Sequence, residues 1–146
     1  MRYLQKIKWN SLTLPEKLAI KTQGRPTPTL IREQPAKSRG KTYTRKFHFN
    51  TYDQNKWICG CAERNSVFCF PCLLFGGDAA WTKKGITDLG HLSEKVETHE
   101  LSKPHKYNCI SLAMLGSANI VTQIDSAHKQ AIIKHNQQVT KNREVL

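Results

Sequence analysis

Two cysteines and two histidines are the side chains of this sequence whose spacing is best suited to chemistry. Cys69 and Cys72 enclose only Phe70 and Pro71, and His99 and His105 follow further along the chain. Thiolates and imidazoles are the ligands that zinc prefers, and two thiolates at this spacing can reach one ion from a tight turn. The pattern C-x2-C-x26-H-x5-H therefore predicts a zinc site. Its four candidate ligands are Cys69, Cys72, His99 and His105.

Other interpretations of the cysteines and histidines stay open. Cys59 and Cys61 form a C-x-C pair. They could complete a four-cysteine site with Cys69 and Cys72, or one of them could replace a single ligand. Cys69 and Cys72 could instead be core residues, as we expect for Cys109. A redox pair is disfavoured, because a thioredoxin-like C-x-x-C follows a parallel strand and no βαβ pattern surrounds this one.

Cysteine number and hydropathy indicate a reducing compartment. Five cysteines cannot all pair internally in disulfides. The first ten residues, MRYLQKIKWN, lack the apolar segment of a secretory signal. No apolar run approaches the roughly 18 residues that a membrane span requires. We therefore expect an intracellular protein, in which closely spaced cysteines favour metal binding.

Basic charge lies at both ends of the chain. Residues 1–50 hold twelve Lys or Arg and two Asp or Glu, residues 51–100 five and seven, and residues 101–146 six and two. A basic arm beside a nearly neutral module is typical of nucleic-acid binding, because cations neutralise phosphates and release counterions. A solvated, disordered tail is the alternative.

Composition and pattern together predict a small α+β domain, whose 38% of hydrophobic residues is low for a globular protein. Residues 1–42 read as a basic flexible arm, with a short helix capped by Thr13 and otherwise extended or disordered chain. Residues 43–116 form the domain: a strand over 45–52, a hairpin over 56–70, and two helices on either side of Ser102 and Pro104. A further helix is expected over 117–146, and its uncapped end suggests a fragment of a longer protein. Its narrow apolar stripe comprises Ile124, Ala127, Ala131, His135 and Val139.

Residues 39–115 resemble the TTF-type zinc finger, a domain named for transposases and transcription factors. The resemblance lies in RGKTYTRKFHF, KWICGCAERNSVFCFPCLLFG and KKGITDLGHLSEKVETHELSKPH. It implies zinc on Cys69, Cys72, His99 and His105, and a DNA-binding, nuclear role of the kind found in hAT-like transposases and zinc-finger MYM-type proteins. The catalytic domain of such transposases needs far more chain than is present here, so we do not expect an enzyme.

The expected function is therefore that of a zinc-dependent DNA-binding module. The cations expected at phosphates are Arg39, Lys41, Arg45, Lys46, Lys83, Lys84, Lys95, Lys103 and Lys106. The alternative is a zinc-stapled protein-interaction module, in which the last helix binds a partner or dimerises.

Overall fold

The computed structural model describes residues 5–6, 8–116 and 134. The chain divides into two compact units, Met1–Ala113 and Met114–Leu146, and only residues 114–116 and 134 of the second are described. The helix predicted over 117–146 therefore lies outside the described residues. The described elements, in chain order, are η1 (Trp9–Ser11), α2 (Leu14–Gln23), β1 (Glu33–Ser38), β2 (Lys41–Lys46), α3 (Asn50–Gln54), β3 (Ile58–Cys61), β4 (Ser66–Cys69), α4 (Phe70–Phe75), η2 (Ala80–Lys84), α5 (Leu92–Leu101) and α6 (Lys103–Met114).

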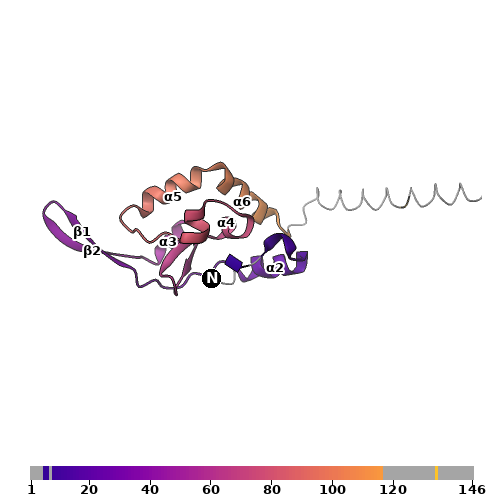
Figure 1. Ribbon diagram of the computed structural model, residues 1–146, viewed down its shortest axis with the longest axis horizontal. Helices are drawn as coiled ribbons and strands as arrows, with labels where there is room; N and C mark the ends of the chain where they lie inside the picture. The colour runs from indigo at the N-terminus through magenta and orange to yellow at the C-terminus, as the bar shows by residue number, and fades with distance from the viewer. Residues whose placement is uncertain (1–4, 7, 117–133, 135–146) are drawn as a thin grey trace, which may run out of the picture. The chain divides into compact units, whose positions relative to one another are not determined.

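The predicted class, a small α+β domain in which a hairpin precedes helices, is confirmed (Figure 1). β3 and β4 pair antiparallel, with Ile58 opposite Cys69. Every residue of both strands is buried. On the other side of β4, Val67 exchanges backbone hydrogen bonds with Ile86. β4 is thus paired on both sides, which fixes the strand that leads into the C-x-x-C turn.

The core is small and lies around this hairpin. Aromatic and aliphatic side chains from the hairpin, α3, η2 and α5 form it, together with two cysteines. Its buried members are Leu30, Tyr52, Trp57, Ile58, Val67, Cys69, Cys72, Trp81, Ile86 and Val96. The two cysteines predicted as ligands therefore belong to the core itself.

The predicted arm contains regular structure. The helix expected after Thr13 is confirmed as α2, and its N-terminus is a capping box in which Thr13 and Glu16 each accept a backbone hydrogen bond from the other. Residues 33–38, predicted as extended or disordered, form strand β1. The boundary predicted after residue 42 consequently falls inside β2.

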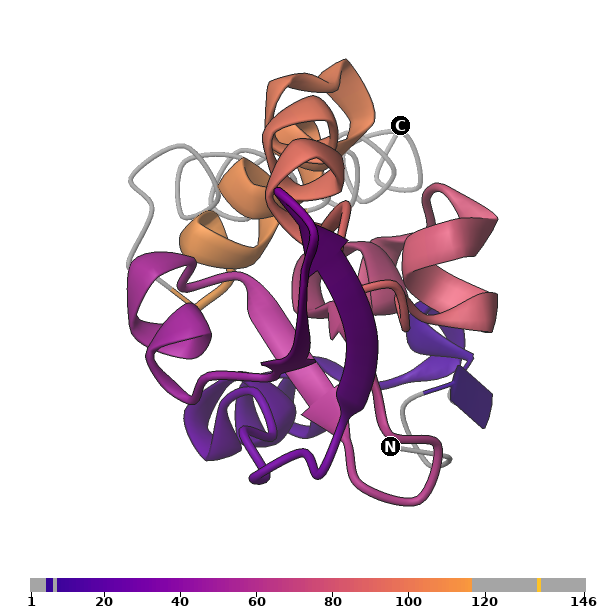
Figure 2. The ribbon, with the colours of Figure 1, turned by 90° about the vertical axis from the view of Figure 1, so that its left-hand side faces the viewer.

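β1 and β2 form a two-stranded antiparallel hairpin that extends away from the other elements in Figure 1 and faces the viewer in Figure 2. Its turn is Arg39-Gly40, and both residues have positive φ, 51° and 77°. Its base is attached to the segment before α5, where the Gln34 amide donates to Asp88 and accepts from the Leu89 N–H. Most of its residues are exposed.

The strand predicted over residues 45–52 is wrong beyond Lys46. α3 begins at Asn50, and Tyr52 is buried on it. The aromatic residues that alternate in the sequence meet in space, because Phe47 and Phe49 each lie edge-on to Tyr52 with ring centroids 5.3 Å apart. Packing around one buried tyrosine overrides the period of two that suggested a strand.

The two helices predicted around Ser102 and Pro104 are confirmed as α5 and α6. Val96 and His99 are buried on α5, and His105 and Asn108 on α6. Among the residues that the structure describes, no helix is long and apolar enough to cross a membrane.

Gly60 in β3 tests how tightly this core is packed. A Cβ at residue 60 would collide with the hydroxyl of Tyr52, which is held by its hydrogen bond to the Pro28 carbonyl, 2.8 Å away. We expect Gly60→Ala to lower the free energy of unfolding by about 1–3 kcal/mol, as over-packing does in a closed core. Urea denaturation at fixed metal concentration measures it. Gly90→Ala, at an exposed position, is the control, and equal stability of both variants would contradict the prediction.

Candidate metal centre

The hairpin and α4 position the two thiols. Cys69 is the last residue of β4 and the N-cap of α4, and Cys72 lies in the first turn of that helix. Pro71 occupies the start of α4, where its fixed φ suits a helix and its missing N–H leaves no bond unmade. The change from strand to helix turns both side chains toward the same point.

A break between α5 and α6 positions the two imidazoles. Pro104 has no N–H to donate to the carbonyl of Glu100, so one continuous helix cannot form. Ser102 is extended instead (ψ 140°), and both its N–H and its hydroxyl donate to the carbonyl of His99, at 3.0 and 2.7 Å. His99 therefore closes one helix and His105 opens the next, as the sequence predicts.

The four side chains converge on one point. Their ligand atoms, one per residue, all lie within 4.8 Å of one another, and all four residues are buried. Cys69 Sγ is 3.3 Å from His105 Nδ1, and Cys72 Sγ is 3.6 Å from His99 Nε2 and 4.0 Å from His105 Nδ1. Four residues from four elements, β4, α4, α5 and α6, thus form a possible metal-binding site.

These separations suit a tetrahedral ion. With metal–sulfur bonds near 2.3 Å and metal–nitrogen bonds near 2.05 Å, a sulfur–nitrogen edge of a tetrahedron is about 3.5 Å long. The three observed sulfur–nitrogen distances, 3.3 to 4.0 Å, bracket that edge. These three pairs are therefore close to the spacing that such an ion requires.

Two tryptophans enclose the histidines. The Trp81 ring stacks on His99 at 4.8 Å, and the Trp57 ring meets His105 edge-on at 4.6 Å. The two indoles also pack on each other, with centroids 5.2 Å apart. These rings fix the imidazole orientations and cover part of the cluster, which reduces the screening of any bond to an ion at the centre.

Asn108 and Cys109, on α6, contact the cluster from its outer side. The Asn108 amide donates to Cys72 Sγ at 3.4 Å and to the Gly76 carbonyl at 2.7 Å. Cys109 Sγ lies 3.3 Å from His105 Nε2, the ring nitrogen that points away from the other ligands. Sequence patterns did not single out Asn108 and predicted an inert core role for Cys109. The sequence feature that could have pointed to Asn108 and Cys109 is their spacing of three and four residues from His105, which places them near it on one helix.

The two thiols differ in acidity. The hydrogen bond from Cys69, with further ones from His99 and Asn108, lowers the pKa of Cys72 to about 4. Burial, and then the hydrogen bond to Cys72, raise the pKa of Cys69 above its usual range. An ion bound by both sulfurs would displace the thiol protons that remain, because the metal ligand is the thiolate.

The two alternative cysteine ligands, and His91 near the start of α5, lie away from the cluster. Within the described part of the chain, Cys59 and Cys61 are buried in β3 but do not belong to the cluster. Burial raises the pKa of the Cys59 thiol to about 12, so it stays protonated. His91 is exposed, and its Nδ1 lies 2.7 Å from an Asp88 oxygen. This contact, together with the hydrogen bond that the Gln34 amide donates to Asp88, holds the pKa of Asp88 below its usual range.

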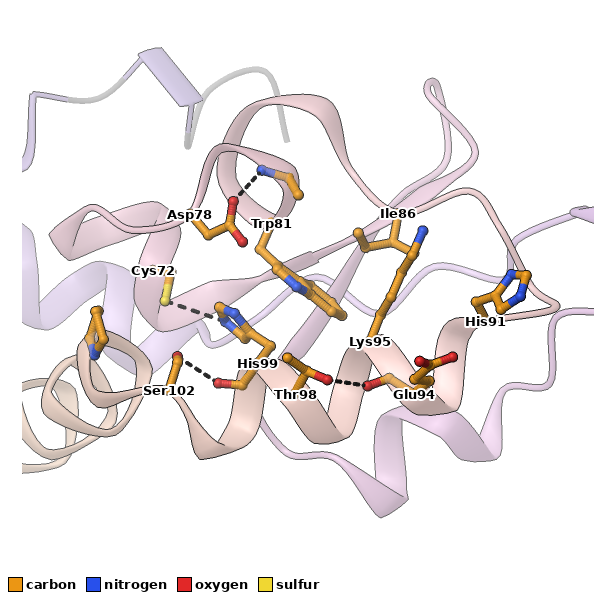
Figure 3. A pocket seen from close by; sticks show the side chains of 12 residues that line it. Cys72, Asp78, Trp81, Ile86, His91, Glu94, Lys95, Thr98, His99 and Ser102 are labelled. Carbon is orange, nitrogen blue, oxygen red and sulfur yellow. Dashed lines mark hydrogen bonds between the residues drawn. The ribbon is translucent and has the colours of Figure 1, made fainter.

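A hollow of about 540 Å³ opens beside the cluster (Figure 3). Cys72 and His99 form part of its wall, and Trp81 and Ile86 provide an apolar surface. Asp78, Glu94 and Lys95 also line it. The hollow gives an ion a route to the buried ligands, as a metal site requires.

The cations predicted for phosphate contact lie on several elements. Arg39 is at the turn of the β1–β2 hairpin, and the others are on β2, η2, α5 and α6. All are exposed except Arg45, which is half-buried with its guanidinium over the Tyr43 ring at 5.5 Å. Lys46 pairs with Glu33 at 3.1 Å, but both side chains are more than half exposed, so this pair contributes little stability.

Comparison of the chain with protein-family models, curated proteins and solved structures gave no match. The resemblance to the TTF-type zinc finger therefore remains a proposal.

Asn108 offers a test of how the cluster is supported. Asn108→Ala removes the donor to Cys72 Sγ and the link to the Gly76 carbonyl, so we expect roughly 10- to 100-fold weaker metal affinity. Competition with a chromophoric chelator measures this affinity. Tyr107→Ala, exposed on the same helix, should match the wild type. Unchanged affinity of the Asn108 variant would show that its hydrogen bonds do not support the site.

Proposed function

We propose that the chain is a zinc-stabilised DNA-binding module. The observation that carries the metal part is the buried cluster of Cys69, Cys72, His99 and His105, with sulfur–nitrogen separations of 3.3 to 4.0 Å. Two thiolates and two imidazoles form a closed donor set typical of structural zinc. Four protein ligands leave no open position for a substrate, so the role of the ion is to stabilise the fold rather than to catalyse.

Charge supports DNA as the partner. The protein carries a net charge of +12, and eight of the nine cations predicted for phosphate contact are exposed. Exposed cations around a rigid body neutralise phosphates on binding, and the released counterions drive association. The TTF-type resemblance and a nuclear location belong to the same proposal.

A protein-interaction module is the second candidate. Leu101, Tyr107 and Ile110 are 71%, 72% and 58% exposed around α6. Tyr107 and Ile110 lie on α6 and Leu101 is the last residue of α5, and exposed apolar side chains of this size are suited to a protein partner. This candidate predicts association that persists at high salt, whereas phosphate contacts weaken as salt rises.

The zinc part is tested by zinc stoichiometry and thermal stability of ligand variants. Cys69→Ser and His105→Ala should each reduce bound zinc and lower the melting temperature, because zinc bound by the folded state contributes directly to its stability. Cys59→Ser and Cys61→Ser are the controls, since both residues are buried in β3 outside the cluster. Zinc loss in these controls, but not in the histidine variant, would favour the four-cysteine site.

The DNA part is tested with the zinc-loaded protein and random duplex DNA across a salt series. We expect binding at low salt and a linear fall of the logarithm of affinity with the logarithm of salt concentration, with a slope of about −0.9 per phosphate contact. Fluorescence anisotropy of labelled duplexes measures it. An absence of binding at low salt would refute the DNA proposal and leave the protein-interaction candidate.

A further inference from the structure

The β1–β2 hairpin is a ribbon without a partner of its own in the described part of the chain. Except for Gln34, Ala36 and Arg45, which are half-buried, residues 33–46 are exposed. An isolated two-stranded hairpin gains little stability in water, because it lacks an apolar face to bury. Its base is attached to the segment before α5, through Gln34 and through the hydrogen bond from Arg32 Nε to the Thr87 carbonyl, 3.0 Å away. Such a ribbon is suited to a partner that supplies the missing contacts.

The positive charge of the hairpin indicates a polyanionic partner. The hairpin carries five cations and one carboxylate, Glu33, so its net charge is +4. The cations are Lys37, Arg39, Lys41, Arg45 and Lys46. Lys37 pairs with Thr42 and Lys41 with Ser38, and consecutive pairs point to opposite faces. Cations therefore project from both faces of the hairpin near its tip. A polyanion with phosphates on the two sides of a groove could contact the cations of both faces.

The edge of β1 disfavours a different partner, a strand of another protein. The hydrogen bond of Phe47 N–H to Arg32 makes that pair a hydrogen-bonded one, so Pro35, opposite Thr44, occupies a non-bonded pair and its nitrogen faces outward. Proline has no N–H, so this edge lacks its central donor. Strand addition on β1 would lose a hydrogen bond there.

The dimensions suit the major groove of duplex DNA. This groove is about 12 Å wide and 8.5 Å deep and admits a two-stranded β-ribbon. Strands lie about 4.8 Å apart and rise about 3.4 Å per residue, so two or three residues of each strand would span the depth of the groove. The part of the hairpin that would enter is residues 37–42, and its tip is Arg39-Gly40.

Arg39 occupies a backbone conformation that arginine adopts at a cost. Two-residue hairpin turns in which both residues have positive φ favour Asn-Gly, because a larger side chain is strained in the left-handed region. Here an arginine holds the first position, exposed at the end of the hairpin. Its guanidinium can donate two parallel hydrogen bonds to O6 and N7 of guanine, the commonest specific contact in the major groove.

We propose that the tip of the β1–β2 hairpin enters the major groove of duplex DNA, where Arg39 binds a guanine and Lys37 and Lys41 contact phosphates on opposite sides. This inference rests on the proposed DNA-binding function and deepens it by naming the base-reading residue.

The test compares three matched duplexes: one containing guanine, one with 7-deazaguanine, which lacks only the N7 acceptor, and one with inosine, which lacks the minor-groove amino group. We expect the zinc-loaded protein to bind the 7-deazaguanine duplex roughly tenfold more weakly than the guanine duplex. Inosine should have no comparable effect, because it keeps O6 and N7 in the major groove.

Two variants of Arg39 distinguish its recognition of guanine from its role in the hairpin turn. Arg39→Asn suits the turn better than arginine and preserves the hairpin, yet it should abolish the difference between guanine and 7-deazaguanine. Arg39→Lys keeps the charge but loses the planar fork of two parallel donors, so it should retain the salt dependence and weaken the discrimination. Zinc content equal to that of the wild type verifies that the metal centre of each variant is intact.

A control variant carries Lys95→Gln, Lys103→Gln and Lys106→Gln, which remove exposed charges from α5 and α6. It should bind DNA more weakly but keep the discrimination. If the wild type binds the guanine and 7-deazaguanine duplexes equally, or if Arg39→Asn still discriminates between these two, the hairpin proposal is overturned while the DNA-binding function stands. If the wild type binds no duplex at low salt, both fail together.

Discussion

The structure depends on a cluster of two thiols and two imidazoles buried in the middle of a small core. Cys69 and Cys72 come from the hairpin side, and His99 and His105 from the helical side. Polar groups removed from water must be satisfied by one another or by a bound ion, and the four ligand atoms within 4.8 Å meet that requirement together. The same contacts hold α5 and α6 against β4 and α4, so the chemistry of the cluster and the packing of the fold are one constraint.

Neighbouring side chains hold the cluster more firmly than its four residues would alone. Trp57 and Trp81 cover the imidazoles, while Asn108 holds both Cys72 and the end of α4. In a buried setting, interactions between charged ligands and an ion are less screened than at the surface. A domain with so few core residues thereby obtains rigidity from a polar centre rather than from apolar volume.

The sequence predicted the parts of the structure whose signals are local. The C-x-x-C turn, the hairpin of β3 and β4, the capping box of α2 and the break at Pro104 each follow from a few adjacent residues. The β1–β2 hairpin was missed because Pro35 reads as a strand breaker, and only the pairing register shows that its nitrogen faces outward. α3 was missed because its aromatic alternation imitates a strand, and Asn108 because its partners are far away in the sequence.

The double pairing of β4 has a consequence for the order of assembly. Val67 is hydrogen-bonded to Ile86 on one side while β3 pairs on the other, so the strand that ends in Cys69 is held without help from α5 or α6. The thiol half of the site can therefore form early, from contacts that are mostly close in sequence. The histidine half has no backbone pairing of this kind, because side-chain contacts, such as those of Trp57, Trp81 and Asn108, hold it to the rest of the domain. An ion captured first by the sulfurs would then act as a nucleus on which the helical half docks.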